Sequence, residues 1–539
     1  MPKLCSCPLC SGLSLNTLDG SIPDTTLAAS LVRTLNPAAP ANTVITNVIS
    51  GDSRIDALLL SASDRLNSSF AFGTPVVVSY SFPTQLPTAY TGDNALGWKP
   101  FSAQQQSAAR EVLGLLQKQI NITFVEVNDS PSAGGTIRFS DNTQSGSAGY
   151  AYQANSSGTS LSSDIFISNN YSTNVTPGSY AWTTMVHELG HALGLKHPGN
   201  YNATQTTNAS AVGNFLGVNE DTFYNTIMSY RDSAQGIHDA WFMPYDLLAL
   251  RYLYGTRAFE TGNNTYAYTD AVGQSVSTVI DDGGTNTLDF SALTIGANIN
   301  LTPGSYSSVG KLKSGAQALA NLTISLGTVI QNVLGTKFGD VIVGNNAGDT
   351  FTGGGGSDTV IGGTGIDTVV FSGPRARYVV IKTPSGQTVV DSTGTDGTDT
   401  LTAIERLRFS DGKLALDLDA EGHAGQTVKL IGAVFGKAAI TSTAYVAAGL
   451  RLLDGGMRYE DLATAAVNET GKSKSSDVVA LLWTNLFDVA PTASQSAPYV
   501  AMLDKGMSTG ALAVMAAETS ENLIHIDLVG LTQTGVVYI

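Results

Sequence analysis

The chain has 539 residues, of which 42% are apolar, and its formal net charge is −16 at neutral pH. This length exceeds what a single hydrophobic core supports, so we expect several domains. The negative charge argues against nucleic acid as a partner. No run of roughly eighteen apolar residues occurs, so we expect no transmembrane segment.

The first 50 residues are expected to form a leader or propeptide-like segment. They lack the apolar core that a cleaved secretory signal peptide requires. All three cysteines of the chain lie here, at Cys5, Cys7 and Cys10. The remainder of the chain therefore has no disulfide framework to stabilise it.

Residues 51–260 mix strand and helix patterns and predict an α/β domain. Ser102 and Gln105 form a capping box that starts a helix running to about residue 119. Two further helices are expected at 182–193 and 244–254. The expected strands cover residues 74–82, 122–127, 136–139, 149–153 and 164–168.

The most informative motif lies in the second of these helices. His187 and His191 are four residues apart, so both imidazoles lie on one helical face, and Glu188 follows His187 on the same turn. Gly194 can adopt the left-handed conformation that ends a helix. The chain can then turn back, so that His197 supplies a third imidazole. Three protein ligands with one open position are typical of a catalytic zinc site. The alternative, a solvated helix face with a glycine cap, is less favoured because the longer motif constrains five positions.

A second motif, Thr226-Ile-Met-Ser-Tyr230, follows the histidines. The long zinc motif with a methionine turn resembles the metzincin metalloproteases, and Pro198 with the Met-Ser-Tyr turn resembles their serralysin branch. The resemblance implies that Met228 forms an apolar floor beneath the zinc ligands. It also implies that Tyr230 is a further zinc ligand that can move away during turnover. Ordinary core packing is the alternative for both side chains.

The resemblance implies a mechanism as well. Glu188 acts as the general base toward a water activated by Zn²⁺, and Tyr230 stabilises the developing oxyanion. A substrate peptide adds as an antiparallel strand along an edge, for which residues 149–153 are the best candidate. An interior strand is an equally good interpretation of that segment. The N-terminal cysteines belong either to a removed leader or to a thiolate that occupies the open zinc position.

A nine-residue repeat begins at Gly335. Glycine recurs at its first place, aspartate at its sixth and an apolar residue at its eighth. This pattern is that of the calcium-binding parallel β-roll of secreted RTX proteins, and it is not expected of a flexible glycine-rich linker. Successive repeats alternate sides, so Asp340 should share a side with Asp358. The expected calcium-site residues are Gly335, Asp340, Gly344, Asp349, Gly353, Gly355, Asp358, Gly362, Thr364 and Asp367.

The first two repeats lack the second glycine, so two strong calcium sites are expected rather than four. A related turn at residues 281–290 carries Asn286 where the family usually has aspartate, which weakens that site. The roll and a β-rich cap are expected to span residues 261–415. Residues 416–539 show alanine and leucine at helical spacing and predict a helical module with an apolar C-terminal secretion signal.

These features predict a multidomain fold: an α/β metzincin protease domain, then a parallel β-roll with a β-rich cap, then a mostly α-helical C-terminal domain. The predicted function is a secreted, extracellular zinc metalloendopeptidase that hydrolyses proteins and is stabilised by Ca²⁺. Its expected partners are protein substrates and the type I secretion apparatus. The alternative is a cell-surface or S-layer-associated RTX protein in which proteolysis serves processing.

Overall fold

The structure, a computed structural model, describes residues 49–154, 161–199, 214–231 and 233–539. The chain forms two compact units. The first combines the chain up to residue 286 with residues 298–329, and the second combines residues 287–297 with 330–539. The three cysteines lie outside the described residues. The division into four parts at residues 50, 260 and 415 stays a prediction.

A mixed sheet forms the framework of the first unit, with strand order β3-β1-β4-β6-β5 and β2 (Lys99–Pro100) beside β4. Neighbouring strands run parallel except that β2 is antiparallel to β4 and β5 is antiparallel to β6. β5 is outermost in this strand order among the described strands. The expected strands are thereby confirmed, and the segment at residues 149–153 begins with the edge strand. The bounds are β1 Val76–Ser81, β3 Ile122–Glu126, β4 Ile137–Asn142, β5 Gly149–Ala151 and β6 Ile165–Ser168.

The first unit contains three longer helices, α3 (Ala103–Gln119), α4 (Tyr180–Ala192) and α5 (Pro244–Tyr254). A short helix, α2 (Ser53–Asp56), precedes them. The predicted capping box of α3 is confirmed, because Ser102 and Gln105 exchange hydrogen bonds. All three helices contribute to one hydrophobic core. The unit also contains β7 (Thr265–Ala267), β8 (Ser277–Val279), β10 (Asn298–Asn300), β11 (Tyr306–Ser307) and β12 (Leu322–Ile324).

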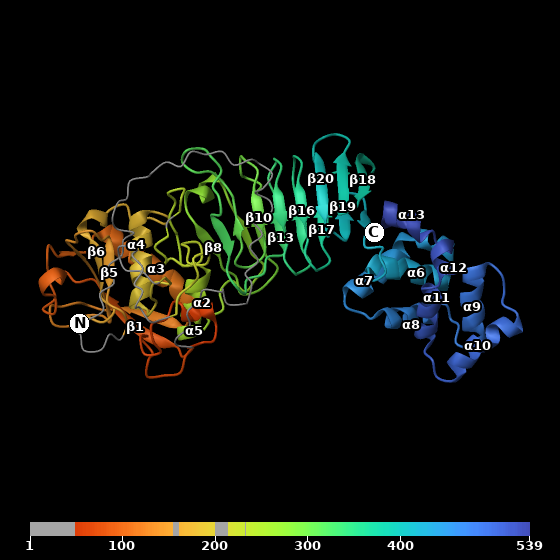
Figure 1. Ribbon diagram of the computed structural model, residues 1–539, viewed down its shortest axis with the longest axis horizontal. Helices are drawn as coiled ribbons and strands as arrows, with labels where there is room; N and C mark the ends of the chain where they lie inside the picture. The colour runs from red at the N-terminus through yellow and green to blue at the C-terminus, as the bar shows by residue number, and fades with distance from the viewer. Residues whose placement is uncertain (1–48, 155–160, 200–213, 232) are drawn as a thin grey trace. The chain divides into compact units, whose positions relative to one another are not determined.

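The second unit contains the nine-residue repeats as a ladder of short parallel strands (Figure 1). β14 (Val341–Val343) pairs with β16 (Thr359–Ile361), and β15 (Thr350–Thr352) pairs with β17 (Thr368–Val370). The predicted alternation of sides is therefore confirmed. The eighth-place side chains point inward and are at most 3% exposed: Ile342, Phe351, Val360 and Val369. β9 (Thr287–Asp289) and β13 (Asn332–Leu334) precede this ladder.

The expected β-rich cap follows the roll. β18 (Tyr378–Thr383) and β19 (Gly386–Asp391) form an antiparallel hairpin. β20 (Thr398–Thr402) then pairs in parallel with β16, and β21 (Arg406–Arg408) pairs in parallel with β17. β22 (Lys413–Ala415) is antiparallel to β21.

The expected helices of the C-terminal region are present as well. They are α6 (His423–Phe435), α7 (Thr443–Asp454), α8 (Tyr459–Glu469), α9 (Ser475–Phe487), α10 (Ala493–Asp504), α11 (Thr509–Ala517), α12 (Ser520–His525) and α13 (Leu528–Thr534). The final strand β23 (Val536–Tyr538) pairs with β22. The apolar end predicted as a secretion signal thus lies in a sheet, and its role in export stays a prediction. Within the described residues, no helix has the length and apolar character needed to cross a membrane.

Candidate metal centre

Helix α4 presents two of the three histidines of the motif. It begins after Ser179, whose hydroxyl accepts a hydrogen bond from the Trp182 amide. It ends at Ala192, and Gly194 just beyond it has a positive φ of +106°, as predicted. A Cβ atom at this position would lie 2.2 Å from the Asp64 carbonyl oxygen, so only glycine fits here. The chain then turns back and carries His197 toward the helix.

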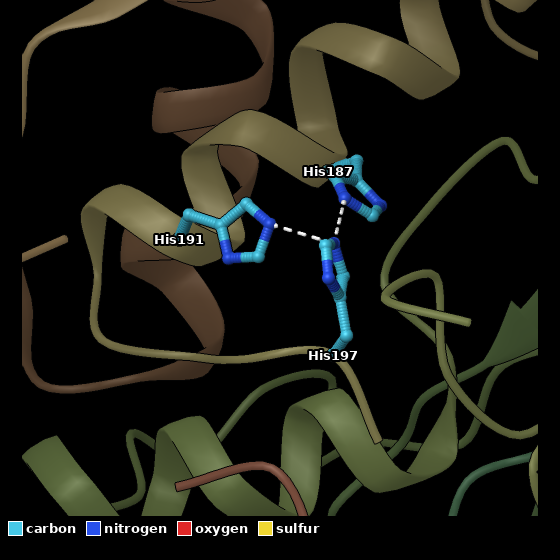
Figure 2. A group of neighbouring side chains, drawn as sticks. All are labelled: His187, His191 and His197. Atoms are coloured by element: carbon cyan, nitrogen blue, oxygen red, sulfur yellow. Dashed lines mark hydrogen bonds between the residues drawn. The ribbon is translucent and has the colours of Figure 1, made fainter. Parts of the chain in front are cut away.

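The three imidazoles converge on one point (Figure 2). His197 Nε2 lies 3.2 Å from His187 Nε2 and 3.0 Å from His191 Nε2. Nitrogens at zinc–nitrogen distances of about 2.0–2.1 Å in a tetrahedral site would be about 3.3 Å apart, which is close to these separations. In the part of the chain that the structure describes, no other group of three or more His, Cys, Asp or Glu side chains converges in this way.

Hydrogen bonds and burial prepare these rings for a cation. His187 Nδ1 lies 2.7 Å from the Ile227 carbonyl oxygen, and His191 Nδ1 lies 2.8 Å from that of Leu195. A carbonyl accepts only from an N–H, so each Nε2 keeps a lone pair directed at the common point. Burial lowers the pKa of His187 to about 4 and that of His191 to about 3, and it lowers the pKa of His197 as well. The rings are therefore neutral at pH 7, as metal ligands must be.

The methionine turn lies directly beneath the histidines. Met228 is fully buried. Its Sδ lies 2.7 Å from the point where a Cβ at Gly190 would stand, and Gly190 lies between His187 and His191 in the helix. The Tyr230 ring centroid is 4.0 Å from that of His197, and the side chain is 3% exposed. Both side chains are thus brought to the site, and their functional roles stay proposals.

Asp246 of α5 fixes this turn, and sequence reasoning did not identify it. The carboxylate is fully buried. Its Oδ1 accepts a hydrogen bond from the Thr226 hydroxyl at 2.5 Å, and its Oδ2 accepts from the Ile227 and Met243 amides at 2.8 and 2.9 Å. The Ile227 amide donates to Asp246 and the Ile227 carbonyl contacts His187, so Asp246 is linked to a candidate ligand through one residue of the turn. A lone aspartate in an amphipathic helix carries no local pattern that would reveal this.

Glu188 lies fully buried next to the edge strand. A Cβ at Gly149, the first residue of β5, would stand 2.9 Å from Glu188 Cγ and 3.0 Å from its Oε1. The absence of a side chain at position 149 lets the strand approach the carboxylate closely. The candidate base therefore lies against the strand that is outermost in this sheet among the described residues.

The repeat aspartates form two ladders in the second unit. The Asp340 amide donates to Asp358 Oδ1 at 2.8 Å, and the Asp349 amide donates to Asp367 Oδ1 at 2.7 Å. Asp349 Oδ1 and Asp358 Oδ2 are buried without a hydrogen-bond partner. Burial, together with neighbouring carboxylates, raises the pKa of Asp349 to about 7 and that of Asp358 to about 8. Orphaned carboxylate oxygens in such surroundings fit a hard cation such as Ca²⁺.

The glycines of the repeats make room for these carboxylates. A Cβ at the first place of each repeat would lie 1.9 to 2.8 Å from an oxygen of that repeat's own aspartate, and these positions are Gly335, Gly344, Gly353 and Gly362. Gly355 and Thr364 occupy the third place of their turns. Asn286, in the related turn at residues 281–290, uses its side-chain amide for hydrogen bonds within the protein. Its Nδ2 donates to the Gly283 carbonyl, and its Oδ1 accepts from the Asn264 backbone amide.

Comparison with known proteins agrees with this geometry. The family model described as "Metallo-peptidase family M12" matches residues 29–241, and "Peptidase M10 serralysin C terminal" matches residues 251–441. "Serralysin G" of Dickeya chrysanthemi is 30% identical over 304 residues, which are 51% of this chain and 61% of the relative. "Serralysin" of Photorhabdus sp. (strain Az29) is 33% identical over 297 residues, 49% of this chain and 58% of the relative.

"Metallopeptidase AprA" of Pseudomonas marginalis is 30% identical over 298 residues, 49% of this chain and 59% of the relative. The chain thus spans about three fifths of the length of these curated relatives, and residues 442–539 lie outside both family models. The relatives imply a metal cofactor, and the histidine group is where the described residues could hold one. The two adjoining family matches and the relatives thus make residues 29–441 of this chain similar to the serralysin-type metzincins.

Proposed function

We propose that this protein is a secreted zinc endopeptidase that cleaves protein substrates. The observation that carries the proposal is the convergence of three neutral imidazole nitrogens beside a buried carboxylate. His187, His191 and His197 would hold Zn²⁺, which when bound would supply a Lewis acid and lower the pKa of a water toward about 7.

The side chains around the metal position have distinct tasks in this proposal. Glu188 removes the proton of the attacking water and later delivers it to the amine leaving group. Its burial keeps the carboxylate out of bulk water, which strengthens its interactions with charge at the reacting centre. Tyr230 donates a hydrogen bond to the carbonyl oxygen of the substrate as negative charge develops there. Met228 supports the imidazoles from below.

The substrate class follows from the strand edge. β5 pairs with β6 on one side only among the described strands, and a substrate strand would add at its other edge. An extended peptide bound there would form main-chain hydrogen bonds, which are independent of side-chain identity. Such binding suits an endopeptidase that accepts unfolded protein segments.

Calcium completes the proposal for the second unit. The buried, unpartnered oxygens of Asp349 and Asp358 support Ca²⁺ in the roll. A roll that requires millimolar-range calcium would stay open in the cytosol and fold outside the cell, in keeping with type I export. A second candidate function is attachment to a cell surface, for which the helical module outside both family models would serve.

The test is cleavage of casein by the purified chain in calcium-containing buffer. A zinc-selective chelator should abolish cleavage, and stoichiometric Zn²⁺ should restore it. Cleavage that persists after complete removal of transition metals would refute the proposal. Cell fractionation after calcium chelation separates the two candidate roles, because a soluble protease stays in the medium with or without calcium.

A further inference from the structure

One of the three candidate metal ligands lies outside helix α4. Figure 2 shows His187 and His191 on the helix and His197 on the chain that returns to it. The helix fixes the positions of its own two ligands through the backbone hydrogen bonds along its length. The third ligand has no such support, so its position depends on the contacts of the segment that carries it.

The segment that leads to His197 is held by residues 57–59. Leu195 forms an antiparallel bridge with Leu59, and the backbone amide that follows Leu195 donates to the Leu58 carbonyl at 2.8 Å. Both contacts precede His197 in the sequence. They leave the chain that follows His197 to be held by other groups.

The Lys196 ammonium joins three parts of the chain at this place. Its Nζ donates to the Ala57 carbonyl at 2.5 Å, to the Asn214 carbonyl at 2.7 Å and to the His197 carbonyl at 3.2 Å. It also lies 4.7 Å from the centroid of the Phe215 ring, a favourable position for a cation. An ammonium has three N–H donors and no acceptor, so three carbonyls are a set that it satisfies completely.

The arrangement differs from that of a lysine in an ion pair. Among the described residues, no carboxylate lies within ion-pair distance of Lys196 Nζ, whose hydrogen-bond partners are all backbone carbonyls. Ala57 is fully buried and Asn214 is 3% exposed, so water has little access to their carbonyls. Such groups need a donor from the protein itself. The partly buried Lys196 side chain supplies it.

The chain beyond His197 is closed at the same place. The carbonyls of His197 and Asn214 accept from one nitrogen, Lys196 Nζ. The Leu216 amide donates to the Pro198 carbonyl at 2.9 Å. The residues on either side of the third histidine are therefore tied to the segment that begins at residue 214 and to residues 57–59.

We propose that Lys196 is a positioning residue for the third metal ligand. The inference rests on the proposed role of the three histidines in holding zinc. By binding the His197 carbonyl together with two carbonyls of other segments, the ammonium holds the His197 backbone where the imidazole meets the other two. Without it, the backbone around His197 would have to be ordered when the metal binds, which lowers the affinity. Loss of such a supporting contact weakens metal affinity about 10- to 100-fold.

The test compares the zinc dissociation constants of the full-length parent and of Lys196→Met by competition with a chelating dye. Methionine keeps a flexible, unbranched side chain and has no N–H donor. The dissociation constant of Lys196→Met should rise about 10- to 100-fold. The visible spectrum of Co²⁺ bound in place of zinc should also change, because this spectrum reports the number and arrangement of the ligands.

Lys311→Met is the matched control. Lys311 is a partly buried lysine of the same unit, and its Nζ lies 3.5 Å from an Asp270 carboxylate oxygen. The control should bind zinc as tightly as the parent and give the parent's Co²⁺ spectrum. Denaturant unfolding in metal-free buffer measures the stability of both variants, so a general loss of stability is separated from a loss of metal affinity.

Equal zinc affinity in Lys196→Met and the parent would overturn the positioning role and leave the proposed function intact. A parent chain that binds no zinc would overturn both. If Lys196→Met does not fold, Lys196→Gln decides, because its side-chain amide keeps two N–H donors for the three carbonyls. Weaker zinc binding by Lys196→Gln supports the positioning role, and unchanged binding overturns it.

Discussion

Replacing Asp246 tests whether the methionine turn positions the metal ligands. Asp246→Ala leaves the buried amides of Ile227 and Met243 without their acceptor, Oδ2. Each unsatisfied buried donor costs about 1–3 kcal/mol, so the free energy of unfolding should fall by about 2–6 kcal/mol. Asp246→Asn should lose only about 1 kcal/mol, because its amide oxygen can take the place of Oδ2 and accept both bonds.

The effect should extend to the metal. The Ile227 carbonyl lies 2.7 Å from His187 Nδ1, so a displaced turn misorients a ligand. Loss of such a supporting contact weakens metal affinity about 10- to 100-fold. Zinc dissociation constants from competition with a chelating dye, together with denaturant unfolding, measure both quantities.

Asp141→Ala is the matched control for Asp246. Asp141 is a buried carboxylate of the same unit, and it accepts one hydrogen bond, from Gln105 Nε2 at 2.7 Å. Burial raises the pKa of Asp141 and of Asp246 alike to about 7. Asp141→Ala should lower stability and leave zinc affinity unchanged. Equal zinc affinity in Asp246→Ala and Asp141→Ala would refute the positioning role.

Three further predictions concern catalysis and calcium. Glu188→Ala should retain zinc, and its kcat/KM for a peptide should fall roughly 10,000-fold. In Tyr230→Phe the same quantity should fall about 100-fold. Casein digestion by Glu188→Ala at the parent rate would contradict the role of Glu188 as general base. Burial, with neighbouring carboxylates, raises the pKa of Asp358 to about 8, and burial raises that of Asp399 to about 7, from an ordinary value of 3.8. The folded, calcium-free roll therefore binds protons more tightly than the unfolded chain, and its stability should fall as the pH rises from about 4 to about 8. Thermal unfolding in the presence of a chelator should show this fall in stability with pH, and excess calcium should remove it. A calcium-free roll that is most stable at pH 8 would contradict the reasoning.

Features with a local period were predictable from the sequence. The spacing of His187 and His191, the glycine at 194 and the nine-residue repeat each follow from the geometry of one helix or one turn. The structure confirms the helix, its glycine end and the alternating sides of the roll. These features depend on residues close in sequence, so a single chain contains enough information to infer them.

Features that depend on distant pairing were not predictable. Asp246 accepts the amide of Ile227, which lies 19 positions earlier in the sequence. Asp399 follows Asp358 by 41 residues because the hairpin interrupts the period, so a search for a fixed repeat length misses it. The last strand pairs with β22 across more than a hundred residues. Such register is set by tertiary packing, and no local pattern marks it.

Metal analysis of the purified full-length chain tests the central claim most directly. The account predicts one zinc ion per chain, with X-ray absorption showing three imidazole nitrogens at about 2.0–2.1 Å, and it predicts loss of that ion in His187→Ala. A chain that folds, retains its calcium and binds no stoichiometric transition metal would contradict it.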